Sequence, residues 1–304
     1  MSGIFWPIFT FNAIFVFLVV VIYRLLAIIR LPIHLRWELA PIPREKGKGG
    51  YGGSYLEDYE WWRKPRRRSR LAPIMYMLQE IFLLRGVWKN NRSLWPFSFS
   101  LHSGIYLIII TLLLHIICAL FIITNVPFSI LNVIQSITSV LALTGYLLGG
   151  LGAIGLILKR ALDINFRTFG TFPTYFRLVF LTAVFISGAY AWVVSGDYAS
   201  ETSTFVKNLI TLDGSITASL PLTAHVIILM LFIVYLPLTD MLHFITKYFM
   251  YHAVRWNDKP LVESMEVKLQ GLINQPIDWS APHAGTGRTW AEIATEKTND
   301  GEKT

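Results

Sequence analysis

The segment that decides the fold runs from His225 to Trp256 and reads HVIILMLFIVYLPLTDMLHFITKYFMYHAVRW. Most of it is apolar, and ionisable side chains are costly in hydrocarbon, yet it contains His225 and His243. The two histidines are 18 positions apart, which in an unbroken helix returns them to nearly the same face, about 27 Å apart along the axis. The spacing therefore predicts a membrane-spanning helix with one imidazole toward each side of a bilayer.

The composition places the chain among membrane proteins. Of 304 residues, 54% are hydrophobic and only 15% are charged, and the mean hydropathy is +0.50, which is too apolar for an ordinary soluble domain. The formal net charge of +8 fits either nucleic acid or the cytoplasmic face of a membrane. Because the basic residues crowd the loops beside apolar runs, we predict contact with membrane lipid and no nucleic-acid partner.

A single cysteine, Cys118, limits the metal chemistry that is open to the chain. One thiol excludes an internal disulfide framework, a cysteine-rich zinc site, a cysteine-ligated iron–sulfur cluster and covalent haem attachment through a C-x-x-C-H motif. Any metal centre must therefore use histidine, and a haem would be bound without a covalent link.

Five apolar runs are long enough to cross a bilayer. The loops after the first and third runs are rich in Lys and Arg, whereas residues 196–220 hold three acidic residues and one Lys, and basic loops stay in the cytoplasm. Basic residues follow the first run instead of preceding it, so we interpret it as a retained helix and not a signal peptide. We predict an all-α membrane protein, a five-transmembrane-helix bundle with its N-terminus outside and its C-terminus cytoplasmic. The predicted spans are 4–29, 99–124, 131–158, 173–194, and a fifth from about 222 that ends among Lys247, Arg255 and Lys259.

Depth in the membrane pairs the histidines of two spans. The second span runs outward and carries His102 and then His115, about 20 Å further out, while the fifth runs inward and carries His225 and then His243. His102 therefore lies level with His243 near the inner face, and His115 lies level with His225 near the outer face. This arrangement predicts two bis-histidine sites for haem b, with these four histidines as axial ligands of the iron.

The helical phase of the second span does not fit this pairing. The 13 positions from His102 to His115 leave the two side chains about 220° apart around an ideal helix. Either an irregular start of the span or a kink at Pro237 in the fifth span could change the phase, and His252 is an alternative inner ligand. The other interpretation is that the four histidines only form hydrogen bonds between helices.

Other polar residues near these spans have two interpretations each. Asp240 could orient the imidazole of His243, since metal-bound histidines usually donate their second N–H to a carboxylate or carbonyl, or it could cap a polar pocket with Thr239. Arg177 and Lys247 could meet haem propionates or extend to the interface as ordinary cations. The third span is dense in glycine, which favours close helix packing or leaves room for a flat macrocycle. These glycines are Gly145, Gly149, Gly150, Gly152 and Gly155.

We divide the chain into four parts: a first transmembrane helix at 1–30, a basic cytoplasmic loop at 31–98, a four-helix haem-binding core at 99–256 and a cytoplasmic partner-binding tail at 257–304. The loop carries 13 Lys/Arg against six Asp/Glu, and Arg63–Arg70 in it fit either an anionic-lipid contact or a docking surface. Residues 72–88 are predicted to form an amphipathic helix on the membrane surface. In the tail, four residues suggest ordering against a partner protein: Trp279, Pro282, His283 and Trp290.

Two motifs in these spans resemble a known family. The motif LHSGIYL at 101–107, and LPLTDMLHF at 236–244 with a histidine 18 positions before His243, are similar to the gamma (cytochrome b) subunit of respiratory nitrate reductase. HFITKYF at 243–249, VRWND at 254–258 and WSAPHAGTGRTWAEIA at 279–294 resemble the DsrM-type membrane cytochromes b within that superfamily. The resemblance covers residues 99–295. It departs at Leu112, where the nitrate reductase pattern has its second histidine.

The resemblance implies a dihaem cytochrome b subunit of a respiratory complex in a prokaryotic cytoplasmic membrane. It implies electron transfer between menaquinol or menaquinone and a cytoplasmic iron–sulfur subunit related to heterodisulfide reductase, in dissimilatory sulfate or sulfite reduction. The family roles carry over to His102, His225 and His243, and the outer leaflet near His115 and His225 is the expected quinol region. No catalytic residue is predicted. The alternatives are a nitrate-reductase-gamma-like or heterodisulfide-reductase cytochrome b, a haem-free membrane anchor, and a transporter that uses its histidines as a proton relay.

Overall fold

The computed structural model describes residues 4–30, 71–213, 216–246, 263–281 and 285–295. Within these ranges the regular structure is helical, apart from an isolated bridge between Pro276 and Thr289. The chain divides into two compact units, Met1–Arg255 and Trp256–Thr304.

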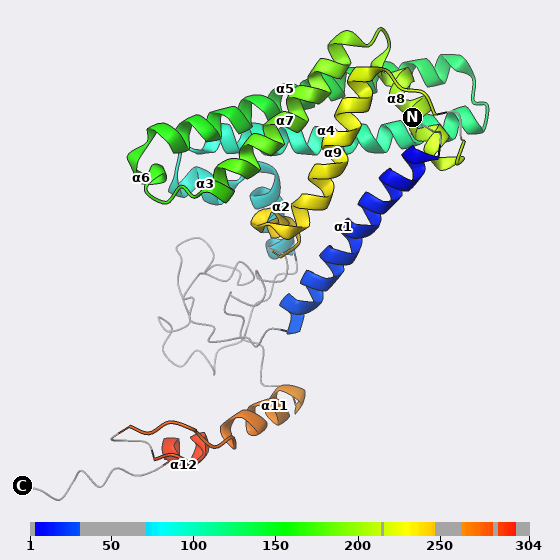
Figure 1. Cartoon of the computed structure of the whole chain (residues 1–304). Coiled ribbons are helices and arrows are strands. Elements are labelled where there is room, and N and C mark those ends of the chain that lie inside the picture. Colours follow the sequence, from blue (N-terminus) through cyan, green and yellow to red (C-terminus); the bar gives the residue numbers. More distant parts are fainter. Residues whose placement is uncertain (1–3, 31–70, 214–215, 247–262, 282–284, 296–304) are drawn as a thin grey trace, which may run out of the picture. The chain divides into compact units, whose positions relative to one another are not determined.

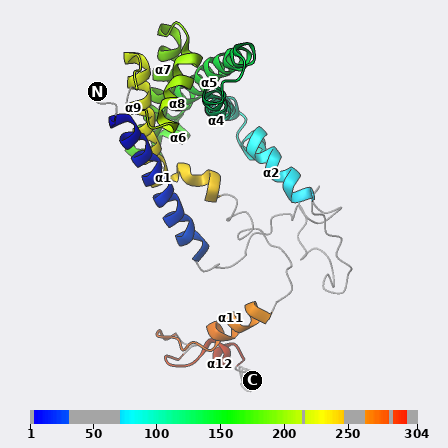
Figure 2. The same ribbon diagram turned by 90° about the vertical axis from the view of Figure 1, so that its right-hand side faces the viewer.

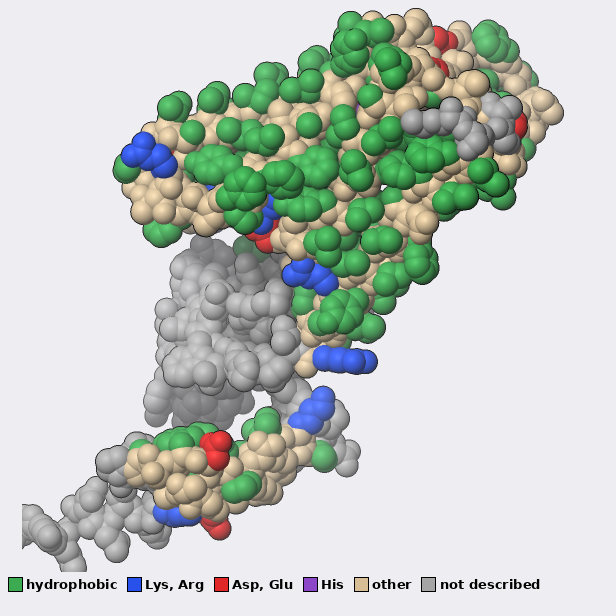
Figure 3. Space-filling view, viewed as in Figure 1, with side chains coloured by type: hydrophobic (Ala, Val, Ile, Leu, Met, Phe, Trp, Pro, Cys, Tyr) green, Lys and Arg blue, Asp and Glu red, His purple; other side chains and the backbone are tan. Residues whose placement is uncertain are grey.

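Five helices of the first unit are long and apolar enough to cross a membrane, which confirms the predicted all-α, five-span architecture. Figures 1 and 2 show α4, α5 and α7 side by side, with α1 along α9. Apolar side chains cover much of the visible surface of this unit (Figure 3), as expected for contact with lipid. The spans are α1 Phe5–Arg30, α4 Trp95–Ile123, α5 Phe128–Leu162, α7 Phe172–Val194, and α9 Leu220–Tyr235 continued by a turn to Leu238.

Proline and capping side chains set the ends of these helices. Pro occupies the first turn of α4, α7 and α9, where a missing N–H costs nothing. At the end of α5, Lys159 forms an ion pair of 2.8 Å with Asp163, which also caps the short helix α6 (Ile164–Arg167) through the N–H of Asn165. The hydrogen bond from Lys159 lowers the pKa of the Asp163 carboxyl.

Glycine brings α4 and α5 into backbone contact. A Cβ on Gly104 of α4 would overlap the backbone of Gly149 on α5, and a Cβ on Gly152 would overlap the backbone of Leu101. A Cβ on Gly155 would overlap the ring of Phe97. Protein atoms therefore fill the space beside these glycines. Close helix packing is confirmed at these positions, and the alternative that the glycines of the third span leave room for a macrocycle stays a prediction.

The segment between the fourth and fifth spans contains a helix that sequence reasoning treated only as a loop. Helix α8, Tyr198–Ile210, begins at Asp197, whose carboxylate accepts a hydrogen bond from the N–H of Ser200 at 3.1 Å. The helix packs on α4 and α5, and its Phe205 contacts Trp6 of α1 with ring centres 5.4 Å apart. Its buried face consists of Tyr198, Ala199, Ser203, Phe205, Asn208 and Leu209.

The fifth span is not one continuous helix, which corrects the assumption behind the 18-residue spacing. Helix α9 ends at Tyr235 and is followed by a 3-10 turn, η3, at Leu236–Leu238. Thr239 is extended (φ −113°, ψ 177°), a second 3-10 turn, η4, covers Asp240–Leu242, and helix resumes at 243–246. Pro237 has no N–H for the helical ladder, so His243 sits on a segment that is separate from the helix of His225.

The predicted amphipathic helix at 72–88 is two helices, α2 Leu71–Leu83 and α3 Arg85–Asn90. Leu84 between them has a left-handed backbone (φ 49°). The C-terminal end of α2 is tied to α4, because the Trp95 indole donates to the Leu83 carbonyl at 2.8 Å and the Tyr106 hydroxyl donates to the Ile81 carbonyl at 2.7 Å.

The second unit has a small structure of its own. It contains α11 Glu263–Ile273 and α12 Trp290–Thr295, and Thr289 and Glu292 form a reciprocal capping box at the start of α12. Ile277 is buried, and Trp279 and Trp290 pack with ring centres 5.9 Å apart. The described tail thus makes contacts within itself. A partner protein stays a prediction, and Pro282 and His283 lie outside the described residues.

Candidate functional site

The rings of the two inner histidines lie next to one another. His102, on the second turn of α4, and His243, just after η4, have ring centres 6.1 Å apart and ring planes inclined by 58°. His102 is half-buried and His243 is exposed. This is the pair that depth in the membrane predicted.

Both imidazoles are oriented by carbonyl groups of their own segments. Nδ1 of His102 lies 2.7 Å from the Ser98 carbonyl oxygen, and Nδ1 of His243 lies 3.2 Å from the Asp240 carbonyl oxygen. A carbonyl oxygen can only accept, so Nδ1 carries the proton in each ring, and the lone pair is on Nε2. An N–H donated to a carbonyl is the usual outer-shell arrangement of a metal-bound histidine.

The inner pair fits an iron ion held between two imidazoles. Metal–imidazole bonds are about 2 Å long, so two rings on opposite sides of one metal have centres roughly 6 Å apart. The observed separation of 6.1 Å agrees with this value. No group of three or more His, Cys, Asp or Glu side chains that could hold a metal ion occurs in the described ranges.

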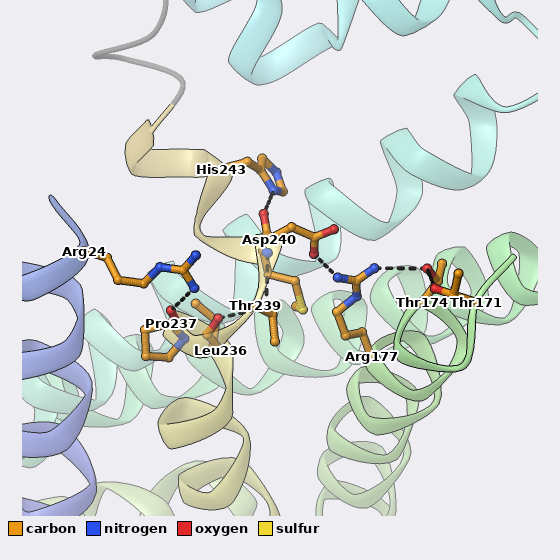
Figure 4. Close-up of polar contacts among 10 residues, drawn as sticks. Arg24, Thr171, Thr174, Arg177, Leu236, Pro237, Thr239, Asp240 and His243 are labelled. Atoms are coloured by element: carbon orange, nitrogen blue, oxygen red, sulfur yellow. Dashed lines mark hydrogen bonds and ion pairs between the residues drawn. The ribbon is translucent and has the colours of Figure 1, made fainter. Parts of the chain in front are cut away.

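Two arginines hold the turn that carries His243 (Figure 4). Arg24 of α1 donates to the Pro237 carbonyl oxygen at 3.1 Å, and Arg177 of α7 forms an ion pair with the Asp240 carboxylate. The other guanidinium nitrogen of Arg177 donates to the Thr174 hydroxyl at 3.2 Å. Asp240 thus reaches His243 through its carbonyl and not through its carboxylate. Lys247 and His252, the other candidates on this side, lie outside the described residues.

The two outer histidines lie in a buried cluster of hydrogen bonds. Within the described part of the chain, their rings do not pack against one another. Nδ1 of His115 on α4 lies 3.0 Å from the Ser203 hydroxyl of α8. Nε2 of His225 on α9 lies 3.0 Å from the Tyr146 hydroxyl of α5, and its Nδ1 lies 3.0 Å from the Ser187 hydroxyl of α7. The cluster therefore links five helices.

The hydroxyl groups determine which atom donates and which accepts in each hydrogen bond of this cluster. The Ser187 hydroxyl donates to the Val184 carbonyl, so it accepts from Nδ1 of His225, and Nε2 of His225 then accepts from Tyr146. The Tyr146 oxygen in turn accepts from the Tyr198 hydroxyl at 2.7 Å. Burial raises the pKa of Tyr198.

One ring nitrogen of His115 has no hydrogen-bond partner in the described part of the chain. The Ser203 hydroxyl donates to the Ala199 carbonyl at 2.6 Å, so it accepts from Nδ1 of His115, and the lone pair of that ring is on Nε2. Nε2 is buried and has no hydrogen-bond partner among the described residues. Such an atom suits a metal ligand, whereas both nitrogens of His225 are engaged. As the outer residues are arranged, only one of the two predicted ligands presents a nitrogen to a metal.

The helical phase that disagreed with the depth pairing explains the difference between the two sites. Helix α4 is unbroken from Trp95 to Ile123, so an irregular start does not relieve the 220° separation of His102 and His115. One side chain meets His243 and the other meets α8. Leu112, at the position where the nitrate reductase pattern has its second histidine, is 52% exposed. The ligand roles of His115 and His225 stay predictions.

Comparison with known proteins adds no relative: no protein-family model, no curated protein and no solved structure matches this chain.

Sequence reasoning missed the residues that surround the histidines. Ser187, Ser203, Tyr146 and Tyr198 complete the outer cluster, and Arg24 reaches the inner one. A signal existed for α8, because its buried residues repeat with a helical period behind the N-cap residue Asp197. No sequence signal pairs Arg24 with a carbonyl 213 positions away.

The outer cluster makes a prediction about stability. Replacing Tyr146 with Phe removes the hydroxyl that Tyr198 and His225 share and leaves Nε2 of His225 buried without a donor. We therefore expect the free energy of unfolding to fall by about 1–3 kcal/mol. Thermal unfolding of the purified protein in detergent measures it. Tyr190→Phe is the matched control, because the Tyr190 side chain is 58% exposed. Equal melting temperatures for the two variants would contradict a structural role for the cluster.

Proposed function

We propose that the protein is a membrane cytochrome b that binds haem between His102 and His243 and conducts electrons between a quinone pool and a redox partner. The observation that carries the proposal is the adjacent pair of imidazoles, 6.1 Å apart, each with Nδ1 directed at a carbonyl oxygen of its own segment. Neither ring is a fully buried core residue, since His102 is half-buried and His243, which follows the last span, is exposed.

The chain itself has three tasks in this function. The carbonyls of Ser98 and Asp240 fix the tautomer and orientation of the two ligands. The apolar spans provide surroundings of low polarity, and Arg177 provides a cation beside the site. Bound haem would supply one-electron redox chemistry, and the axial ligands and their surroundings would set its potential.

The resemblance described above supports finer proposals. We propose menaquinol as the electron donor and a heterodisulfide-reductase-like iron–sulfur subunit as the acceptor, in dissimilatory sulfate or sulfite reduction in a prokaryotic cytoplasmic membrane. Failure of a menaquinol analogue to reduce the haem in membranes would exclude the proposed donor. We also propose the orientation with the N-terminus outside, which labelling of a cysteine placed in the tail tests from either side of sealed vesicles.

The absorption spectrum of the purified protein tests the central proposal. After reduction with dithionite we expect the sharp bands of a low-spin b-type haem, and a haem assay is expected to give at least one haem per chain. A second haem, held by His115 and His225, requires Tyr146 to leave Nε2 of His225. A protein that is folded and purified from haem-replete cells without b-type bands would disprove the cytochrome.

The second candidate function is a haem-free membrane anchor. The outer cluster favours it, because His115 and His225 there tie helices together through hydroxyl groups. The same spectrum separates the two candidates, since an anchor has no haem bands.

A further inference from the structure

The segment that carries His243 is not held in place by its own helix. In a continuous helix the Pro237 carbonyl would accept from the N–H of Met241, but that N–H donates to the Thr239 hydroxyl at 3.1 Å. The helical ladder is interrupted at Pro237 and again at the extended residue Thr239. Something outside the fifth span must therefore fix the position of His243.

Arginines from two other spans supply this support. Arg24 of α1 takes the place of the missing donor at the Pro237 carbonyl, with a distance of 3.1 Å. Arg177 of α7 binds the Asp240 carboxylate and is itself held by the Thr174 hydroxyl. The two guanidinium groups approach the segment from different helices (Figure 4).

Asp240 passes this support to the imidazole. Its carboxylate is bound to Arg177, while its carbonyl oxygen lies 3.2 Å from Nδ1 of His243. The ion pair ties the backbone of Asp240 to α7 through its side chain, so a movement of this backbone away from Arg177 would break the ion pair and also displace the carbonyl that orients the ring. The Arg177 side chain is only 18% exposed, which limits the positions open to it, whereas Asp240 is 70% exposed. An ion pair with one well-exposed partner adds little to folding stability, so its loss is expected to leave the fold intact.

We propose that Arg24 and Arg177 are positioning residues for His243, and that they set the ligand geometry, and with it the redox properties, of the haem. This inference rests on the proposed function, since it concerns a haem bound to His102 and His243. The chemistry is orientation of an axial ligand through its outer shell, where substitutions typically cost about 10–100-fold in affinity.

The test uses Arg24→Gln, Arg177→Gln, Asp240→Asn and the Arg177→Gln/Asp240→Asn double variant of the full chain. We expect each single variant to shift the low-spin signal of the ferric haem in electron paramagnetic resonance and to release haem on the order of 10-fold faster. The double variant is expected to release haem no faster than either of its single variants, because each single substitution already removes the same ion pair. Arg167→Gln, at an exposed position in the last turn of α6, is the matched control.

A purely electrostatic role gives a different result. Loss of the Arg177 cation would lower the midpoint potential and loss of the Asp240 anion would raise it, with unchanged paramagnetic signals. That outcome, or signals identical to the wild type in all variants, overturns the inference. If Arg24→Gln does not fold, Asp240→Asn still tests the inference, because this substitution keeps the size of the side chain. Absence of haem from the wild type would instead refute the proposed function.

Discussion

Replacement of His243 with Ala is expected to abolish the haem bound between His102 and His243. A bis-histidine haem that loses one ligand loses its low-spin spectrum, and with the ring of His102 alone we expect little haem to survive purification. Absorption spectra and a haem assay measure the loss. If a second haem is bound by His115 and His225, about half of the haem remains.

The exposure of His243 allows a chemical rescue. Free imidazole added to His243→Gly, where the side chain leaves space, is expected to restore the low-spin bands. Phe244→Ala, at the next position and 56% exposed, is the control that should keep its full haem content. A His243→Ala protein with the haem content and spectrum of the wild type would refute the assignment of this ligand.

Substitution of Gly104 with Ala is expected to have the largest effect on the fold. The added methyl group would overlap the backbone of Gly149, which cannot move aside as a side chain can. Helices α4 and α5 must then separate, and overpacking of this kind typically costs about 1–3 kcal/mol. Because His102 lies two positions before Gly104, we also expect weaker haem retention. Thermal unfolding in detergent and the haem assay measure both effects.

The control for this substitution lies on the facing helix. A Cβ on Gly150 would lie 3.6 Å from the Phe185 Cβ, an ordinary contact, so Gly150→Ala is expected to unfold near the wild-type temperature. A Gly104→Ala protein as stable as Gly150→Ala would contradict the close approach of α4 and α5.

The spans were predictable because each depends on local composition. A run of apolar residues must form a helix in hydrocarbon, since every backbone N–H and C=O needs a partner within the segment. The first four spans therefore lie close to their predicted positions, as in α7, predicted at 173–194 and found at Phe172–Val194. The fifth begins where it was predicted but ends at Leu238, before the basic residues that were expected to end it. The pair of His102 with His243 followed from depth alone, and its rings are in contact.

The outer histidines show the limit of that reasoning. The sequence predicted His115 and His225 at the same depth in the membrane, but depth does not determine the direction in which each side chain points. The phase of the unbroken helix α4 turns His115 toward α8, and the position of α8 depends on the packing of its buried face and not on the composition of its loop. Tyr146 and Tyr198 meet His225 for the same reason, since contacts between α5, α8 and α9 place them.

The sequence by itself determined the membrane class, the five helical spans and the histidine chemistry open to a chain with one cysteine, because these depend on composition and on local spacing. Only the tertiary structure decided that His115 and His225 each bond to hydroxyl groups of other helices. It also decided that the fifth span is interrupted at Pro237 and that Arg24 and Arg177 hold the interrupted segment. Those contacts join residues far apart in the chain, and their geometry depends on how the helices pack and not on the order of their residues.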